Sequence, residues 1–325
     1  MPVDVLLVSL GSTHGWVTSD AAFAGALRRA GAVVAIERAA RPREVRTLAL
    51  TDLAWAVAAR RAARRGIAAH APRAIVYSTS TAALLWPRPG AIRFDALAAE
   101  NRPGRHGLWQ RRVEARRLAA APLLLPMSTV AVGDAAKAVV IPPTVTPSGP
   151  PTPSGERDVA AVIYASDPVK KGLERVLDAW ARARRGDEEL VVFTEHAVPQ
   201  APGVRVEPVD RDAFRATLRR ARTYVVAPRY EDFGIAQLEA LADGCMLVTT
   251  DAPGPYEARE IARALDPRLV TDDLATALRT ALDDPAPDYA TRAAALVAPF
   301  SPEAVDARVA SEVLPRLLDG VHPTT

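Results

Sequence analysis

The stretch RTYVVAPRYEDFGIAQLEALADGCMLVTTD, residues 222–251, decides the fold of this chain. It opens with the apolar run 224–227, which predicts a buried parallel strand. The loop at 228–234 holds two acids, two aromatic residues and a glycine. Residues 235–242 have the apolar spacing of a helix, a glycine follows in the C-cap position, and 246–250 predict a second strand. Strand, loop, helix and strand form one half of a nucleotide-binding α/β sheet, in which ligands lie at the carboxyl ends of the strands.

Two glutamates give this stretch a chemical character. Glu231 lies in the loop, and Glu239 lies inside the helix among leucines and alanines. A carboxylate close to an apolar face needs polar partners, and the hydroxyls of a ligand are suitable ones. The backbone amides of Phe233, Gly234 and Ile235 start the helix and suit a phosphate. Backbone amides that suit a phosphate and carboxylates that suit hydroxyls together match a sugar nucleotide. The alternative interpretation is that a buried glutamate here only caps a neighbouring loop and binds no ligand.

The pattern Glu, seven residues, Glu within EDFGIAQLE-ALADG-MLV resembles the donor-site motif of glycosyltransferase family 4, the large group of retaining GT-B enzymes. Ala227 and Pro228 stand where that family usually has proline and serine, and Asp232 replaces a common glycine. The resemblance implies that Glu231 contacts the donor sugar and that Glu239 contacts the ribose of the nucleotide.

A second motif of that family has its counterpart in YASDPVKKGLERVLDAW, residues 164–180. The family has a glycine-arginine pair followed by lysine-glycine. Lys171-Gly172 matches the second pair, so the resemblance implies that Lys171 binds the diphosphate. The arginine is missing, and Lys170 or Arg229 are the possible substitutes.

The N-terminal half begins with a Rossmann-like strand, loop and helix. Residues 3–9 predict the first strand, and Thr18 or Ser19 is expected to cap the helix. The intervening GSTHGW lacks the G-x-G-x-x-G spacing of a dinucleotide fingerprint. The resemblance places this loop near the donor phosphate, which makes Gly11 and His14 candidates; an ordinary loop histidine is an equal interpretation of His14.

The acceptor side is expected in loops of the same half. Apolar runs predict strands at 91–94 and 137–141, and a basic, turn-rich loop spans 101–107. In the resembled family a histidine or an acid of such loops contacts the donor sugar or the acceptor hydroxyl. The candidate catalytic residues are therefore Glu231, Lys171, His106 and Asp95. The candidate donor-binding residues are Gly11, His14, Lys170, Lys171, Arg229, Glu231, Asp232, Phe233, Gly234, Ile235 and Glu239.

The proline-rich run PPTVTPSGPPTPSGE, residues 142–156, divides the chain. We expect a Rossmann-like acceptor-side domain at 1–145, a linker at 146–157, a nucleotide-sugar-binding domain at 158–300 and a helix at 301–325 that returns to the N-terminal domain. The expected fold class is α/β, namely GT-B, with two Rossmann-like β/α/β domains that face each other across a cleft. The resemblance covers the C-terminal half well and the N-terminal half only in the order of its elements.

Composition places the chain among globular proteins. Of its 325 residues, 49% are apolar and 24% are charged. Cys245 is the one cysteine, so no intrachain disulfide can form, and a reducing, cytoplasmic location fits. Cys245 enters a predicted strand, where a buried core thiol is favoured over a nucleophile. No run approaches the length of a membrane span, and the N-terminus has no basic segment of the kind that opens a signal peptide.

Charge is distributed unevenly along the chain. Residues 1–150 hold 20 of the 41 basic side chains and 9 of the 38 acidic ones, a net charge of +11, whereas the remainder carries −8. A basic half suggests an anionic or lipid-linked acceptor, or a peripheral position on an anionic membrane surface. An arginine-rich coding bias together with attraction between the domains explains the asymmetry equally well.

The resemblance implies a metal-independent, hexosyltransferase-like enzyme that moves a sugar from a nucleoside-diphosphate sugar to an acceptor hydroxyl with retention. We expect no cofactor, no metal and no nucleic-acid partner, because no His, Cys and acid cluster has ligand spacing. The missing arginine favours the alternative, a GT-B protein that binds sugar nucleotides as a scaffold without turnover. A hydrolytic or phosphorolytic enzyme on the same fold is the third hypothesis.

Overall fold

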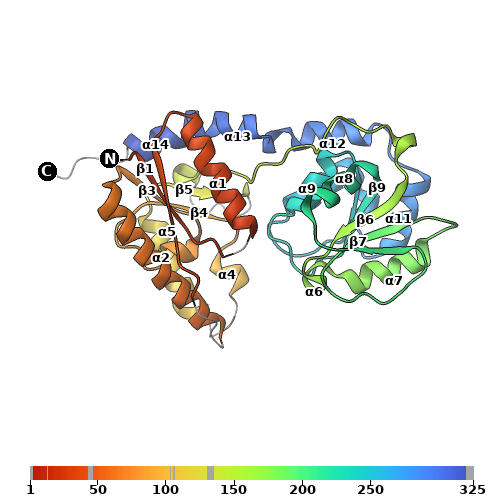
Figure 1. Ribbon diagram of the computed structural model, residues 1–325, viewed down its shortest axis with the longest axis horizontal. Coiled ribbons are helices and arrows are strands. Elements are labelled where there is room, and N and C mark those ends of the chain that lie inside the picture. Colours follow the sequence, from red (N-terminus) through yellow and green to blue (C-terminus); the bar gives the residue numbers. More distant parts are fainter. Residues whose placement is uncertain are drawn as a thin grey trace. The chain divides into compact units, whose positions relative to one another are not determined.

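The computed structural model describes residues 3–12, 14–42, 47–102, 104, 107–129 and 135–319. The chain divides into two compact units: unit 1 comprises residues 1–144 and 302–325, and unit 2 comprises residues 145–301. Each unit is built around its own five-stranded parallel sheet with helices packed on it (Figure 1). The predicted pair of Rossmann-like α/β domains is confirmed.

The sheet of unit 1 has the strand order β2-β1-β3-β4-β5. Val5 of β1 pairs with Val34 of β2 on one side and with Ala74 of β3 on the other. The central strands consist of buried apolar residues because helices cover both faces of a parallel sheet. The strands are β1 Val5–Ser9, β2 Val34–Arg38, β3 Ala74–Tyr77, β4 Ala91–Phe94 and β5 Leu124–Pro126.

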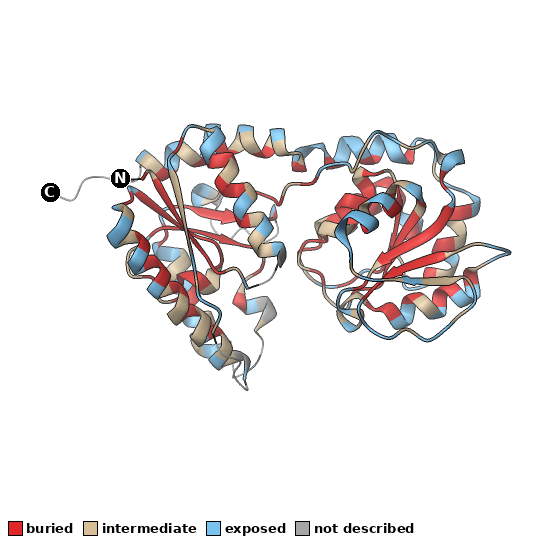
Figure 2. Ribbon diagram, in the orientation of Figure 1, coloured by how far each residue is buried: buried red, intermediate tan, exposed pale blue. Residues whose placement is uncertain are grey.

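Successive residues of β1 point to opposite faces of this sheet and enter two apolar clusters. Val5 and Leu7 pack in one cluster with α1, while Leu6 and Val8 pack in the other with α2 and α3. Figure 2 shows the buried strands between helices whose outer surfaces are exposed. The helices before residue 145 are α1 His14–Arg29, α2 Leu48–His70, α3 Ser80–Ala83, α4 Ala98–Asn101, α5 Leu108–Ala120 and the 3-10 turn η3 Ala135–Lys137.

The residues after 301 complete the core of unit 1. They form α13 Pro302–Arg308, the π-helical segment η7 Val309–Val313 and α14 Leu314–Asp319. A stripe of apolar residues at intervals of four lies in the same cluster as Val5 and Leu7: Val305, Val309, Val313 and Leu317. An ion pair of 2.5 Å between Arg29 and Asp306 fixes α13 to α1, and Figure 1 shows the two helices side by side.

The sheet of unit 2 has the order β10-β9-β6-β7-β8. Its strands are β6 Val159–Tyr164, β7 Leu190–Phe193, β8 Val204–Glu207, β9 Ala221–Val226 and β10 Met246–Thr249. Its helices are η4 Ser154–Glu156, α6 Pro168–Lys171, α7 Leu173–Ala183, α8 Arg211–Arg220, α9 Ile235–Ala242, α10 Glu257–Leu265, η5 Pro267–Leu269, α11 Leu274–Asp283, α12 Tyr289–Val297 and η6 Ala298–Phe300. The stretch that decides the fold therefore forms β9, α9 and β10, as predicted.

Two local predictions for unit 1 are wrong. Helix α1 begins at His14, ahead of the expected caps, and the hydroxyl of Ser19 instead accepts a hydrogen bond of 2.9 Å from Arg93. Residues 137–141 form no strand, since only Ala138 makes an isolated bridge to Leu124. The segment still lies along β5, because the amides of Val139 and Ile141 donate to the carbonyls of Leu124 and Pro126 at 2.9 Å.

Two further segments belong to unit 2. Residues 168–171, which carry the lysine pair, form the short helix α6, because Asp167 caps it through a hydrogen bond of 2.9 Å from the Lys170 amide. The expected linker at 146–157 packs on unit 2. Its Ser148 amide donates to Asp243 at 2.6 Å, and Arg157 is buried with a hydrogen bond of 2.6 Å to the Ala221 carbonyl.

Candidate active site

The strand order of unit 2 fixes where a ligand would bind. The chain runs from β6 outward through β7 and β8, then crosses to the other side of β6 to form β9 and β10. Strands β6 and β9 are therefore neighbours at the point where the order reverses. Ligands of open α/β sheets bind outside the carboxyl ends of the strands at such a switch point. The loops that leave β6 and β9 carry the lysine pair and the first glutamate of the sequence analysis.

Backbone hydrogen bonds join these two loops. The Ala227 amide donates to the Lys171 carbonyl at 3.2 Å, and the Arg229 amide donates to the Lys170 carbonyl at 3.0 Å. Gly172 has φ of +65°, and a Cβ on it would lie 1.9 Å from the carbonyl oxygen of Ala227. Only glycine fits this approach, which explains why Lys171 is followed by glycine.

Lys171 and Glu231 form the centre of the site. The Lys171 Nζ lies 2.5 Å from the Glu231 Oε2, and both side chains are largely buried, at 15% and 6% exposure. Gln237, which is fully buried, donates to the same oxygen at 3.0 Å. A charge-assisted bond in a semi-buried site is stronger than one in water, so the carboxylate is held in one orientation.

A second layer of hydrogen bonds supports Gln237. Its Nε2 lies 3.3 Å from the hydroxyl of Tyr256, which in turn lies 2.9 Å from the Thr249 hydroxyl. Burial raises the pKa of Tyr256 above its ordinary value, so its hydroxyl stays protonated. The carboxylate is thus tied through Gln237 and Tyr256 to the end of β10. Neither supporting residue was among the predicted site residues.

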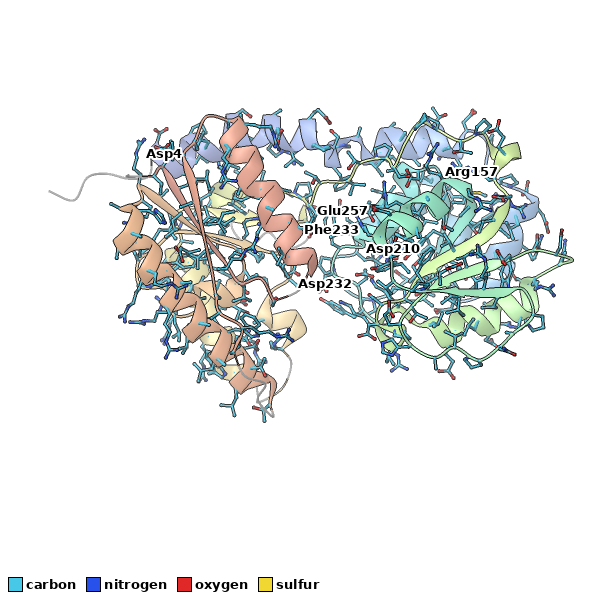
Figure 3. The ribbon with its side chains drawn as sticks, viewed as in Figure 1. Asp4, Arg157, Asp210, Asp232, Phe233 and Glu257 are labelled. Carbon is cyan, nitrogen blue, oxygen red and sulfur yellow. The ribbon has the colours of Figure 1, made fainter. Side chains whose placement is uncertain are left out.

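The loop ahead of α9 brings the other predicted donor residues to the same place. The Lys170 Nζ lies 3.0 Å from the Asp232 carboxylate, and Arg229 is exposed at the start of the loop. Phe233 is buried, with its ring centroid 5.9 Å from that of Phe300 in an edge-on contact. Figure 3 shows Asp232 and Phe233 side by side in this loop.

Two helices begin in the loops of this site. Gly172 precedes α7 and Gly234 precedes α9, and neither helix has a side-chain cap. Gly234 has φ of +86°, and a Cβ on it would lie 2.8 Å from the Tyr256 ring. Uncapped amides at a helix start, next to a lysine, form an environment that favours an anion.

Glu239 is held by arginines. It is buried, and Arg211 donates to both of its oxygens, with 2.9 Å between Nη1 and Oε2. Arg215 lies 3.6 Å from the same carboxylate and 3.3 Å from Asp243. Arg211 and Arg215 are one helical turn apart on α8, which begins after Asp210 (Figure 3). Neither arginine was among the predicted site residues, because 28 residues separate Arg211 from Glu239 in the sequence and no local spacing links them.

The remaining candidates belong to unit 1. Gly11 follows β1 with φ of +60°, and Asp95 follows β4 and accepts a bond of 2.9 Å from the Ala96 amide. His14 is the first residue of α1, but its side chain is outside what the structure describes. His106 lies outside the described residues. The structure therefore brings the side chains of Lys170, Lys171, Glu231 and Asp232 together in unit 2. The roles of the candidates in unit 1 remain predictions.

Unit 1 has its own buried polar cluster at the carboxyl end of β1. The Ser9 hydroxyl donates to Asp20 at 2.6 Å, and Arg93 donates to Asp20 at 2.8 Å and to Ser19 at 2.9 Å. Burial raises the pKa of Asp20, which the charge of Arg93 opposes. This cluster was not predicted, although the single arginine inside the apolar strand AIRF was a signal for it.

Cys245 carries no nucleophilic chemistry. Its side chain is fully buried, and its thiol lies 3.0 Å from the Leu218 carbonyl. Burial raises the pKa of the Cys245 thiol to about 12, so the thiolate is absent near neutral pH. The prediction of a core thiol is confirmed.

Two further findings concern the described part of the chain. Among the residues that the structure describes, no three His, Cys, Asp or Glu side chains are grouped so that they could hold a metal ion. None of the described helices has both the length and the apolar character that crossing a membrane requires.

Residues 159–284 match the family model described as Glycosyl transferases group 1, and this range contains the whole switch-point site of unit 2. No curated protein matches the chain. The family match supports glycosyltransferase activity.

Solved glycosyltransferase structures share the fold at low sequence identity. Sucrose-phosphate synthase from Thermosynechococcus elongatus is similar with a TM-score of 0.65 and 16% identity, over 98% of this chain and 99% of that one. HepE of Anabaena, solved with UDP and glucose, has a TM-score of 0.65 and 15% identity, over 95% and 98%. The lipopolysaccharide outer core galactosyltransferase WaaB has a TM-score of 0.63 and 13% identity, over 95% and 99%. The chain has the GT-B fold, as predicted.

Proposed function

We propose that this protein is a retaining, metal-independent and hexosyltransferase-like enzyme, a member of glycosyltransferase family 4. It would move a sugar from a nucleoside-diphosphate sugar to an acceptor hydroxyl. One observation carries the proposal: Lys171 and Glu231 meet at 2.5 Å at the switch point of unit 2, beside two helix N-termini that have no side-chain cap. The cation and the amides suit a diphosphate, and the carboxylate suits sugar hydroxyls.

The family match and a solved structure with the same fold support a nucleotide sugar as the donor. The group 1 match covers both loops and both glutamates. HepE, which has the same fold, was solved with UDP and glucose, and these are the two parts of such a donor. We assign the diphosphate to Lys171 and the uncapped amides, the donor sugar to Glu231, and the ribose to Glu239.

In the proposed reaction, the acceptor oxygen forms a bond to the anomeric carbon of the donor while the bond from that carbon to the diphosphate oxygen breaks. Attack from the face that the diphosphate leaves gives retention. The leaving phosphate oxygen takes the proton of the acceptor hydroxyl on that same face. Negative charge grows on the diphosphate as the bond breaks, and Lys171 with the amides near Gly172 and Gly234 stabilises it. Such preorganised electrostatic stabilisation is the largest single contribution in many enzymes.

The pairing of Lys171 with Glu231 has a mechanistic consequence. Without a ligand each charge neutralises the other, so neither is left unpaired in a largely buried position. When the donor binds, the lysine would turn to the diphosphate and the carboxylate to the sugar hydroxyls. Gln237 would keep the carboxylate oriented through its bond of 3.0 Å.

Arg211 extends the assignment of the ribose site. Arg211 is half-exposed while Glu239 is buried, so the ribose hydroxyls would share a carboxylate that the protein already orients. A carboxylate has about four lone-pair positions, and Arg211 takes one on each oxygen. The free positions can accept two ribose hydroxyls.

We infer an anionic or lipid-linked acceptor from unit 1. Exposed arginines lie along two of its helices: Arg61, Arg64 and Arg65 on α2, and Arg112 and Arg116 on α5. A surface of this kind attracts anionic substrates and the anionic headgroups of a membrane.

A test of the function has two steps. First, calorimetry with nucleoside diphosphates, UDP before the others, should give saturable binding that Glu239→Ala weakens. Second, release of nucleoside diphosphate from the sugar nucleotide should require an acceptor. Donor binding without release, across a panel of anionic and lipid-linked acceptors, would favour the scaffold protein. Fast release without any acceptor would favour a hydrolase. Either result would contradict the proposal.

A further inference from the structure

A hollow of about 230 Å³ opens in unit 1 at the amino edge of the sheet, where β3 and β4 begin. This is the edge opposite the carboxyl ends at which ligands of such sheets usually bind. Its apolar wall includes Ala74, Ile75, Leu123 and Leu317, and its polar lining includes three arginines, Arg73, Arg88 and Arg316. No acidic side chain lines it among the described residues.

The three arginines differ in how they are engaged. Arg73 lies 3.2 Å from Asp4, whose other oxygen accepts a bond of 2.9 Å from the Val33 amide. Arg88 donates to the Pro72 carbonyl at 2.7 Å. Arg316, on α14, has no ion-pair or hydrogen-bond partner among the residues that the structure describes. Among the described residues, Arg73 is thus the one arginine of the three that is paired with a carboxylate, which leaves the positive charges of Arg88 and Arg316 without an ion pair.

The scaffold keeps Arg88 at the rim. The Tyr77 hydroxyl donates to the Arg88 carbonyl at 2.8 Å, and burial raises the pKa of Tyr77, so this donor stays protonated. The next glycine, Gly90, lies so close to β3 that a Cβ would be 2.4 Å from the Ile75 carbonyl oxygen. Both the backbone and the guanidinium of Arg88 are thus fixed by neighbouring groups, which lowers the entropy cost of binding an anion.

We propose that this hollow binds a phosphate monoester that carries a short apolar chain. A monoester dianion matches the two uncompensated charges, and guanidinium groups bind phosphate oxygens through paired N–H donors. The apolar wall receives the chain. An apolar cavity of about 150 Å³ holds benzene, so this hollow has room for the phosphate and a chain on the order of four carbons.

The site would also join distant parts of the sequence. Arg316 and Leu317 come from the helix after residue 301, whereas the other lining residues come from 73–123. A ligand that bridges them stabilises the packing of α14 on the sheet, because it binds only the docked arrangement. The inference does not depend on the proposed function, since none of these residues belongs to the donor site.

Calorimetry with n-butyl phosphate on the full chain tests the proposal. We expect one saturable site, with affinity at least about fivefold weaker in Arg316→Ala and in Arg88→Ala. Arg38→Ala removes an exposed arginine at the end of β2 in the same unit and should leave the affinity unchanged. Inorganic phosphate should bind more weakly than butyl phosphate, because it leaves the apolar wall in contact with water. Thermal unfolding of each variant shows whether it is folded.

Three outcomes would overturn the site. The first is an unchanged affinity for butyl phosphate in folded Arg316→Ala. The second is an affinity for butyl phosphate that equals the affinity for inorganic phosphate. The third is loss of butyl phosphate binding in Lys171→Ala, which would move the ligand to the donor site. Hydrogen exchange provides a second readout: butyl phosphate should slow exchange in α14, and unchanged exchange there would contradict the bridge. Vesicles that contain phosphatidic acid separate the sources of the ligand. Binding to them that depends on Arg316 indicates a lipid headgroup, and butyl phosphate binding without vesicle binding indicates a free metabolite.

Discussion

Lys171 and Glu231 are sixty residues apart in the sequence, and their side chains meet with 2.5 Å between Nζ and Oε2. Each follows a strand at the switch point of the sheet, so the parallel arrangement of β6 and β9 creates the contact. The pair places a cation suited to a phosphate beside a carboxylate suited to hydroxyls. The account of function depends on this relationship more than on any other.

Glu231→Gln should separate turnover from nucleotide binding. The carboxylate is assigned to the sugar, so affinity for the bare nucleoside diphosphate should hold, while turnover falls at least about tenfold, about 1.4 kcal/mol of lost transition-state stabilisation. Calorimetry and steady-state rates measure the two effects. Glu174→Gln, an exposed change on α7, is the matched control. Equal losses of binding and turnover in Glu231→Gln would show that the two glutamates do not divide the donor as proposed.

Glu239→Ala should weaken nucleoside-diphosphate binding by about tenfold or more, because charge-assisted bonds to ribose are worth about 1.5–3 kcal/mol each. Arg211→Ala should cost less than about threefold, since its half-exposed ion pair is worth little and Arg215 remains nearby. The double variant should match Glu239→Ala if Arg211 acts only through that carboxylate. Calorimetry with the nucleoside diphosphate on the two single variants and the double variant measures these affinities. An unchanged affinity in folded Glu239→Ala would remove this residue from the ribose site.

Gly172→Ala tests whether the lysine loop needs glycine. Gly172 and Gly186 both have positive φ, but a Cβ on Gly172 would lie 1.9 Å from the Ala227 carbonyl, and one on Gly186 would meet nothing within 4 Å. Gly186→Ala should lose roughly 1–2 kcal/mol of unfolding free energy, the cost of the left-handed backbone. Gly172→Ala should lose at least about twice that, because the Ala227 carbonyl must also move. Urea denaturation measures the unfolding free energy of both variants. Equal losses would show that the Ala227 carbonyl moves at little energetic cost to make room for the added Cβ.

The thiol of Cys245 should be unreactive in the folded protein. Its pKa is raised by burial to about 12, so below that pH the folded chain keeps the thiol protonated, whereas the unfolded chain ionises at its ordinary value of 9.0. A thiol reagent at pH 8 should label native protein very slowly and label it fully in denaturant. Because Cys245 is the one cysteine of the chain, the signal has a single source. Rapid labelling of native protein would mean that the core of unit 2 opens readily.

The sequence predicted the features of the fold that come from local patterns. Strand β9, helix α9 and strand β10 were predicted because an apolar run, a helical period and a glycine stop follow one another. The start of α1 was predicted incorrectly, because hydroxyl residues are good helix caps, whereas the hydroxyl of Ser19 instead accepts a hydrogen bond from Arg93. A capping rule cannot tell which partner a hydroxyl finds in the folded chain.

The candidate site residues that were predicted from the sequence are those that lie in motifs. The resemblance pointed to Lys171, Glu231 and Glu239, and strand order brings the first two together. Gln237 and Arg211 were not predicted, since each acts through a side-chain contact that the spacing of one motif does not reveal. Arg211 is 28 residues from Glu239, and only the packing of α8 beside α9 makes them neighbours.

The steady-state rate of Lys171→Ala, measured beside Lys137→Ala once an acceptor is known, tests the central claim most directly. Lys137 is an exposed lysine of unit 1, so its removal controls for the loss of one charge. Lys171 is proposed to act on charge that grows as the diphosphate leaves, so turnover in Lys171→Ala should fall about a hundredfold or more. Donor affinity should fall less than about tenfold, because Lys170 and the helix amides remain. Lys137→Ala should keep the wild-type rate. A Lys171→Ala enzyme that turns over as fast as wild type would contradict the account and place the diphosphate elsewhere.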